Sequence, residues 1–189
     1  MRRNNGTNFQ NLNLYRTPND FRGKSKFTVQ FWWVIYALFF RTSPQVFYGW
    51  RRFLLRCFGS KIGKGVIIRP SVQITYPWKV SIGDYSWVGD DVVLYSLGEI
   101  QIGANSVISQ RSYICTGTHD YTKSNFPIYS KKIVIDNGCW IATDVFVGPG
   151  ITIKEGTVVG ARSSVFKDLD SFSIYAGSPA KFIKKRTIE

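Results

Sequence analysis

The chain has 189 residues, of which 44% are hydrophobic and 20% are charged, so it is expected to fold around a core of its own and is neither disordered nor collagen-like. Twenty-five lysines and arginines against twelve acidic residues give a net charge of +13, with a balance of +9 in residues 1–60. This excess favours an anionic partner, such as a nucleic acid, a phospholipid surface or a phosphorylated small molecule.

The cysteines and the histidine narrow the possible chemistry. Cys57, Cys115 and Cys139 are odd in number and lack CxxC spacing, so neither a disulfide framework nor a cysteine-based zinc site is expected. A reducing, cytoplasmic compartment is the simpler interpretation. There is one histidine, His119, too few for a zinc site built on three histidines, and no metal is expected.

Residues 1–60 are expected to form an arm followed by a helical segment. Residues 1–26 are polar and basic, so we expect no signal peptide and predict an arm that lies along a neighbour. Residues 27–58 read as an amphipathic or buried helix that breaks near 42–44. As a helix, the apolar run 27–40 would span about 21 Å, short of the ~30 Å hydrocarbon core of a bilayer.

Two interpretations of residues 27–58 are compatible with each other. Bulky side chains favour a cap over the open end of the sheet that follows, because exposed β edges promote aggregation. The combination of aromatic residues with Arg51, Arg52 and Arg56 also fits a peripheral contact with the inner face of a membrane.

From residue 62 onward, aliphatic residues recur every six positions, with two irregularities of two residues and one longer insertion at 119–134. This period fits short strands joined by tight turns, each directing one aliphatic side chain into a shared interior. Three hexapeptides would close one triangular coil, and coils begin near residues 62, 82, 102, 135 and 153. The fifteen positions are Ile62, Ile68, Ile74, Ile82, Val88, Leu94, Ile102, Ile108, Ile114, Ile135, Ile141, Val147, Ile153, Val159 and Val165.

These features resemble the hexapeptide-repeat superfamily. The resemblance implies an all-β fold: a left-handed parallel β-helix of about five coils over residues 61–170, preceded by the N-terminal helical segment and followed by a basic segment over residues 171–189. Members of the superfamily usually assemble as trimers, prism against prism. A homotrimer with active sites between subunits is therefore expected.

His119 lies where the repeat gives way to the insertion 119–134. Long insertions in regular folds tend to be functional. Imidazole is suited to take a proton from an alcohol that attacks an activated acyl group. The position and the residue type together make His119 the first candidate for chemistry.

The resemblance is more specific in the segments 115–121, 140–142, 147–150, 159–163 and 176–180. They are similar to the acetyl-CoA-dependent acetyltransferases of this superfamily, which include the galactoside and maltose O-acetyltransferases. A closer similarity, to the colanic-acid-biosynthesis acetyltransferases of exopolysaccharide pathways, adds segments 48–52, 74–78 and 126–127. It covers about residues 30–187.

The resemblance implies that His119 is a general base, which deprotonates a sugar hydroxyl for direct attack on the acetyl-CoA thioester. A backbone N–H near the site would stabilise the oxyanion. Asp120 and Asp90 are candidates to orient the imidazole, although Asp90 is equally compatible with a solvated turn. Cys115 is not expected to be a nucleophile, because the similar enzymes transfer the acyl group directly.

The resemblance also implies positions for coenzyme A. Trp140 matches a tryptophan beside the acyl donor, with corner packing as the alternative role. Four further candidates fall along the groove between prisms: Thr143, Ala161, Phe166 and Lys167. At the basic end of the chain, Lys181 and Lys184 are suited to bind the phosphates of the coenzyme.

The acceptor side differs from the galactoside enzymes. Gly89 and Leu97 stand where those enzymes hold the sugar with an Asn and an Asp, so either the acceptor is not a simple galactoside or other residues bind it. Asp90 and Tyr95 are the candidates, because a tyrosine ring can stack on a sugar face.

The sequence therefore predicts an acetyl-CoA-dependent O-acetyltransferase that modifies an exopolysaccharide or a lipid-linked oligosaccharide intermediate. An N-acetyltransferase of an amino sugar or antibiotic, with His119 again as the base, and a β-helix scaffold without activity remain as alternatives. No nucleic-acid partner is expected, because the prism carries no recognition motif.

Overall fold

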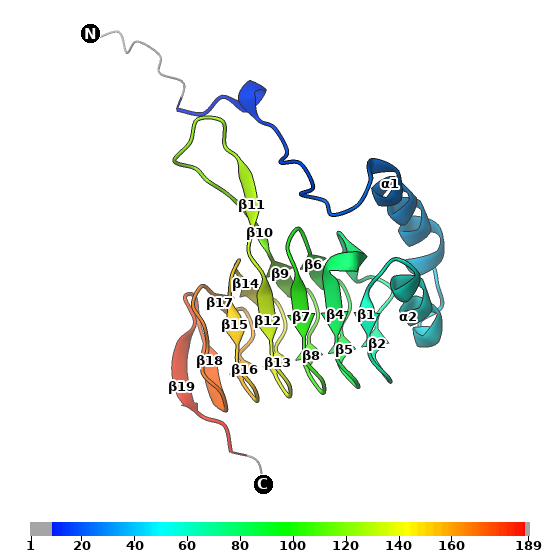
Figure 1. The fold of residues 1–189 in the computed structure, drawn as a ribbon. Helices are drawn as coiled ribbons and strands as arrows, with labels where there is room; N and C mark the ends of the chain where they lie inside the picture. The colour runs from blue at the N-terminus through cyan, green and yellow to red at the C-terminus, as the bar shows by residue number, and fades with distance from the viewer. Residues whose placement is uncertain (1–8, 188–189) are drawn as a thin grey trace, which may run out of the picture.

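The computed structural model describes residues 9–187 and shows a solenoid of stacked triangular coils with a helical segment at one end (Figure 1). Each turn of the chain contributes one strand to each of three parallel sheets. Sheet 1 contains β1 (Lys61–Ile62), β4 (Val80–Ile82), β7 (Ile100–Ile102), β12 (Ile133–Ile135) and β15 (Thr152–Ile153). Sheet 2 contains β2 (Ile67–Ile68), β5 (Trp87–Val88), β8 (Val107–Ile108), β13 (Trp140–Ile141), β16 (Val158–Val159) and β18 (Ser173–Ala176), with β19 (Lys181–Lys185) added antiparallel at its edge. Sheet 3 contains β3 (Gln73–Ile74), β6 (Val93–Tyr95), β9 (Tyr113–Cys115), β14 (Phe146–Val147) and β17 (Ser164–Val165).

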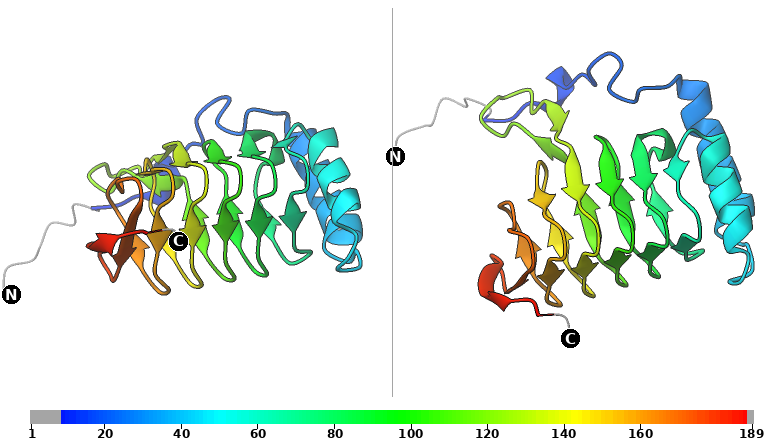
Figure 2. Two further views of the ribbon diagram at one scale, coloured as in Figure 1. Left: turned by 90° about the horizontal axis from the view of Figure 1, so that it is seen from below. Right: turned by 60° about the horizontal axis from the view of Figure 1, so that its bottom comes forward.

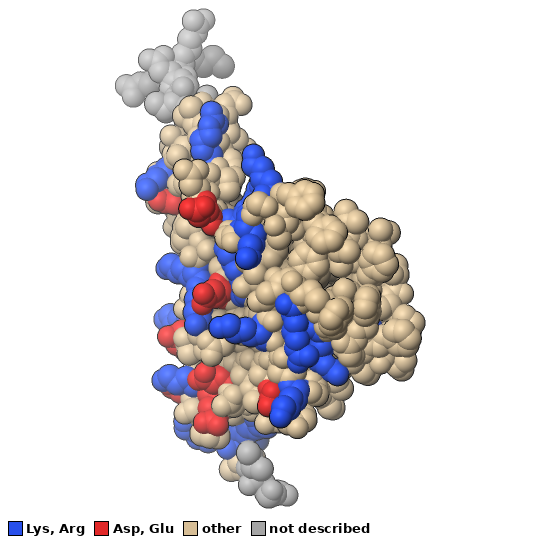
Figure 3. Space-filling model, turned by 45° about the vertical axis from the view of Figure 1, so that its right-hand side comes forward, with Lys and Arg blue, Asp and Glu red and all other residues tan. Residues whose placement is uncertain are grey.

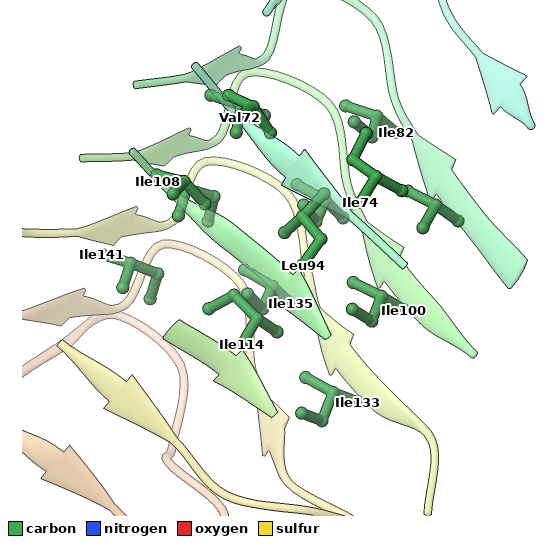
Figure 4. Close-up of a cluster of buried hydrophobic side chains, with 14 of the residues drawn as sticks. Val72, Ile74, Ile82, Leu94, Ile100, Ile108, Ile114, Ile133, Ile135 and Ile141 are labelled. Atoms are coloured by element: carbon green, nitrogen blue, oxygen red, sulfur yellow. The ribbon is translucent and has the colours of Figure 1, made fainter. Parts of the chain in front are cut away.

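The six-residue period defines the interior. All fifteen aliphatic positions are buried, and they pair in register along three ladders, such as Ile62, Ile82 and Ile102 in sheet 1. Figure 4 shows Leu94, Ile114 and Ile135 meeting in this interior. The predicted fold class, a left-handed parallel β-helix of about five coils with an N-terminal helical segment, is confirmed.

Buried hydroxyls continue the stacking at the corners. The Ser86 hydroxyl donates to the Gly103 carbonyl at 2.6 Å and accepts from the Ser106 amide at 3.0 Å. The Ser106 hydroxyl repeats the arrangement one coil later, donating to Asp136 and accepting from Cys139. These bonds satisfy backbone groups that the corners would otherwise leave unpaired in the interior.

A helical cap closes the first coil, and Figure 2 shows it from two further directions. It consists of α1 (Lys26–Ile35), which begins at the capping Ser25, a π-helical turn over Tyr36–Phe40, and α2 (Tyr48–Cys57). The Trp32 indole donates to the Ile74 carbonyl at 2.9 Å, and Arg51 donates to Ile68 at 2.7 Å. Arg52 and Arg56 bond to further carbonyls of the first coil, at Val66 and Ile62.

The expected cap over the open end of the solenoid is thus confirmed. The carbonyls of the first coil have no preceding strand to bond to, and the cap supplies N–H donors in place of a further coil. Arg51, Arg52 and Arg56, which the sequence made candidates for a membrane contact, instead donate to carbonyls of the first coil.

Residues 9–25 form an arm that crosses this chain's own solenoid from the insertion to α1 (Figure 1). The arm contains a short 3₁₀ turn, Leu12–Leu14. A second 3₁₀ turn, Pro77–Lys79, lies in the solenoid just before β4. The insertion itself forms an antiparallel hairpin of β10 (Gly117–His119) and β11 (Ile128–Ser130). The hairpin leaves the solenoid at the corner between sheets 3 and 1, because β9 precedes it and β12 follows it.

Candidate active site

His119 is the last residue of β10 and is half-buried. Its Nδ1 lies 2.9 Å from the Phe126 carbonyl oxygen across the hairpin, and the imidazole stacks on the Phe126 ring with centroids 4.2 Å apart. A carbonyl accepts only, so Nδ1 carries the proton and Nε2 has a free lone pair. This tautomer is the one that a general base requires.

The conformation of Phe126 sets the direction of its carbonyl. Its φ is 46°, in the left-handed region that a bulky residue rarely adopts, and its amide donates to the Lys123 carbonyl at 2.9 Å. This turn directs the Phe126 carbonyl toward His119.

The two carboxylates that the sequence suggested as orienting groups have other partners. Asp120 accepts bonds from Thr122, and these bonds hold the pKa of its carboxyl below the ordinary value, with Lys123 adding to the effect. Asp90 pairs with Arg69 at 2.8 Å, in a turn between sheets 2 and 3. The structure therefore corrects the sequence expectation: the partner of Nδ1 is a backbone carbonyl, and neither aspartate contacts the imidazole.

The two candidates for binding the acceptor, Tyr95 and Asp90, lie at different corners of the solenoid. Tyr95 ends β6 in sheet 3, half-buried, and packs beside Gly117, two residues before His119. Burial raises the pKa of the Tyr95 hydroxyl. Asp90 lies one corner away from this position, because its turn precedes sheet 3 and the hairpin follows it.

The candidates for coenzyme A gather on a different part of the prism. Trp140 is 48% exposed on the outer face of sheet 2, and its indole donates to the Ser109 hydroxyl at 3.0 Å. Thr143 and Ala161 occupy successive turns between sheets 2 and 3, where the Arg162 amide donates to the Thr143 carbonyl at 2.9 Å.

The remaining candidates lie toward the C-terminal end. Lys167 and Phe166 are exposed just after β17. Lys181 and Lys184 are exposed on β19, which extends the sheet that carries Trp140. The structure thus gathers most of the coenzyme candidates along sheet 2 and its corner with sheet 3.

His119 and the pair Thr143 and Ala161 belong to different corners of one triangular prism. His119 follows sheet 3, whereas Thr143 and Ala161 precede it, so the width of sheet 3 separates the base from these residues. A site that contains both needs the sheet 3–1 corner of one copy against the sheet 2–3 corner of another.

Cysteine chemistry is disfavoured at this site. Burial raises the pKa of the Cys115 thiol, and burial raises that of Cys139 to about 11. A thiol in such surroundings stays protonated and is a poor nucleophile. Among residues 9–187 there is also no group of three or more His, Cys, Asp or Glu side chains placed to hold a metal ion.

Two residues near the base could not be selected from the sequence. The Phe126 carbonyl is a backbone group, and only the Phe126-Pro127 similarity pointed to that segment. Tyr15, whose ring centroid lies 6.3 Å from that of His119, belongs to an arm without periodicity and gave no signal.

Comparison with known proteins identifies acetyltransferases as relatives of the chain. The chain is 60% identical over 177 residues to the protein named colanic acid biosynthesis acetyltransferase WcaF of Escherichia coli K12, covering 94% of this chain and 97% of that one. No family model matches the chain. Among solved structures, a galactoside acetyltransferase in complex with coenzyme A superposes with a TM-score of 0.79 at 23% identity, over 90% of this chain and 84% of its own. A maltose O-acetyltransferase from Clostridium difficile 630 gives 0.77 at 24% identity, over 87% and 90%.

The fold and the identity to an acetyltransferase define a hexapeptide-repeat acyltransferase. At 60% identity over nearly the full length of WcaF, the chain belongs to the colanic acid biosynthesis acetyltransferases within that family.

Proposed function

We propose that this protein is an O-acetyltransferase that moves the acetyl group of acetyl-CoA to a hydroxyl of a saccharide, part of an exopolysaccharide or of its lipid-linked precursor. The observation that carries the proposal is the His119 imidazole, whose Nδ1 proton is bound by the Phe126 carbonyl so that Nε2 is available as a base. The relatives named above act on sugars or on colanic acid synthesis, which supports a saccharide acceptor.

The reaction follows from this geometry. Nε2 of His119 removes the proton of the acceptor hydroxyl as its oxygen attacks the thioester carbonyl carbon. The tetrahedral intermediate collapses with cleavage of the C–S bond, and the imidazolium returns the proton to the leaving thiolate. The products are an O-acetyl ester and coenzyme A. Throughout the cycle the Phe126 carbonyl stabilises the imidazolium and fixes the ring.

Coenzyme A supplies the activated acetyl group, and the surface features of sheet 2 fit it. The exposed Trp140 indole, the open turns at Thr143 and Ala161, and the exposed lysines of β19 offer an apolar wall, backbone groups and cations in sequence along one side of the prism. We assign Lys181 and Lys184 to the phosphates. Lys167 follows sheet 3, so we assign it to the side of the groove that the sheet 3–1 corner of the facing copy forms.

The active protein in this proposal is a homotrimer. Its support is the separation of His119 from Thr143 and Ala161 on different corners of one chain. A three-fold arrangement of prisms sets the sheet 3–1 corner of each copy against the sheet 2–3 corner of the next, and three equivalent sites result.

Mixing two inactive variants tests the shared site. His119→Ala lacks the base, and Ala161→Arg obstructs the coenzyme groove. If each site takes His119 from one copy and Ala161 from the next, random mixed trimers recover about a quarter of the wild-type activity. A mixture that stays inactive while mass measurement shows mixed trimers contradicts the proposal. His119→Ala mixed with itself is the control.

The proposal places the enzyme in the cytoplasm with its helical cap on the membrane. In the described residues no helix is long and apolar enough to cross a bilayer. The outer face of the cap is apolar, and Figure 3 shows it as a broad surface largely free of charged side chains. No acidic residue occurs between Asp20 and Asp84. The exposed side chains are Phe27, Phe31, Trp33, Val34, Leu38, Phe39, Val46, Phe47, Trp50 and Phe53.

An apolar surface of this extent marks an interaction site, and its aromatic residues suit the headgroup region of a bilayer. Vesicle flotation tests it: the pair Leu38→Ser and Phe47→Ser should reduce binding to phospholipid vesicles at least about fivefold. Phe182→Ser, which changes an equally exposed phenylalanine on β19, should leave binding unchanged. Equal binding of both variants contradicts the membrane contact.

Thiol release from acetyl-CoA is the primary test of the activity. The acceptors are maltose, a β-galactoside, an amino sugar and lipid-linked saccharides, with wild type compared to His119→Ala. Acceptor-dependent release that the variant loses, while it still binds coenzyme A, supports the proposal. Release with the amino sugar alone, with an amide as the product, would assign N-acetylation. A wild type that binds no acetyl-CoA would overturn the proposal.

A further inference from the structure

The N-terminal arm is fixed at both ends of its crossing. Near its start, the Asn11 amide donates to the Ser124 carbonyl at the tip of the insertion, at 2.7 Å. Near its end, the Trp78 indole donates to the Arg22 carbonyl at 2.7 Å and the Lys79 ammonium to the Phe21 carbonyl at 2.6 Å. The segment between these anchors therefore has a defined path over the hairpin.

Tyr15 is the side chain that this path directs inward. Leu12 and Leu14, in the preceding 3₁₀ turn, are 61% and 54% exposed, whereas Tyr15 is half-buried. The Tyr15 amide closes the turn by donating to the Leu12 carbonyl at 3.1 Å. Its ring lies 6.3 Å from the imidazole of His119, inclined at 48°.

Phe126 occupies two sides of the His119 imidazole and leaves the Nε2 edge for an acceptor. One face of the ring is covered by Phe126 and Nδ1 is bound to its carbonyl. Within residues 9–187, Nε2 has no hydrogen-bond partner. Among the described residues, Tyr15 is the aromatic neighbour of the imidazole other than Phe126.

We propose that Tyr15 forms a wall of the acceptor site and stacks on the apolar face of the sugar ring whose hydroxyl faces Nε2 of His119. The inference rests on the proposed function, since it names the element that holds the saccharide. Aromatic rings combine a large apolar area with few rotatable bonds, which suits the C–H face of a pyranose. The arm then supplies the grip that Gly89 and Leu97 do not provide.

The single histidine of the chain gives a direct test. Diethyl pyrocarbonate acylates free imidazole nitrogens, so its reaction with His119 reports access to Nε2. Tyr15→Ala should react at least about threefold faster than wild type, and millimolar maltose or β-galactoside should slow the reaction of wild type but not of this variant. Leu14→Ala, one residue away and exposed, should behave like wild type.

Kinetics provide the second readout. With the most active acceptor, Tyr15→Ala should raise the KM for the saccharide about five- to tenfold and leave the KM for acetyl-CoA unchanged. Tyr15→Phe, which keeps the ring, should restore wild-type values. Asn11→Pro removes the amide that holds the arm on the hairpin and should reproduce the Tyr15→Ala effect without altering the ring.

The outcomes separate the two proposals. Equal acylation rates for wild type and Tyr15→Ala, or no protection of wild type by any saccharide, overturn the role of the arm. If His119→Ala retains full transferase activity, the proposed function fails instead, whatever the acylation of Tyr15→Ala shows.

Discussion

Nδ1 of His119 is bound by the backbone carbonyl of Phe126 at 2.9 Å, and this bond sets the tautomer of the only histidine in the chain. A carbonyl supplies orientation without a net charge, whereas a carboxylate would supply both. The base therefore depends on the conformation of the hairpin rather than on a second ionisable side chain.

This relationship distinguishes His119 from its neighbour. His119→Ala should lower kcat/KM by about 10²- to 10⁴-fold, the range usual for a general base. Asp120→Asn should retain activity within about threefold, since its carboxylate bonds to Thr122 and not to the imidazole. Thiol release with both purified variants measures the contrast. A loss of comparable size in Asp120→Asn would show that the aspartate acts on His119 during turnover.

The cap depends on Arg51, which is fully buried. Its guanidinium donates to the Ile68 carbonyl, the Ser43 hydroxyl and the carbonyls of Pro44 and Gln45. Arg51→Met leaves the buried Ile68 carbonyl unpaired and removes the bonds to the three partly buried acceptors, so it should lower the free energy of unfolding by about 3 kcal/mol. Urea denaturation at one fixed protein concentration measures the loss. Arg41→Met, at an exposed site, should change it by less than about 0.5 kcal/mol.

Two glycines should respond in opposite directions to alanine. A Cβ on Gly103 would lie 2.6 Å from the Asn137 amide nitrogen of the next coil, so Gly103→Ala should cost about 2–3 kcal/mol. A Cβ on Gly49, within α2, would meet only the Arg52 side chain at 3.8 Å, and Gly49→Ala should stabilise by about 0.5–1 kcal/mol. Thermal unfolding of the pair checks both signs. A stable Gly103→Ala would mean that the coils can separate at this corner.

We expect the buried Cys139 thiol to make the folded protein less stable at alkaline pH. Burial raises its pKa in the folded protein to about 11, above its ordinary value near 9. The contribution to stability is therefore fully present below the unfolded pKa and declines as the pH rises from there toward 11. Between about pH 8 and about pH 10 the free energy of unfolding should fall by about 1 kcal/mol more in wild type than in Cys139→Ser. Parallel slopes for the two proteins would remove Cys139 as the cause.

The sequence by itself determined the solenoid and the place of its one interruption. The aliphatic positions such as Ile62, Ile82 and Ile102 repeat at a local spacing that only stacked short strands can bury together, and His119 marks the point where that spacing stops. A cap over the first coil could also be predicted, because the apolar residues of 27–58 precede an edge that must be covered.

Only the tertiary structure decided how the site is built. The partner of His119 is a backbone carbonyl, which residue identities do not encode, and Tyr15 reaches it from an arm with no periodic pattern. The same holds for Arg51, which turns inward to the first coil rather than outward, and for the corner that separates His119 from Thr143. These features depend on where the chain crosses itself in space, and a side-chain pattern that repeats every six residues fixes the coils but not the path of the segments that leave them.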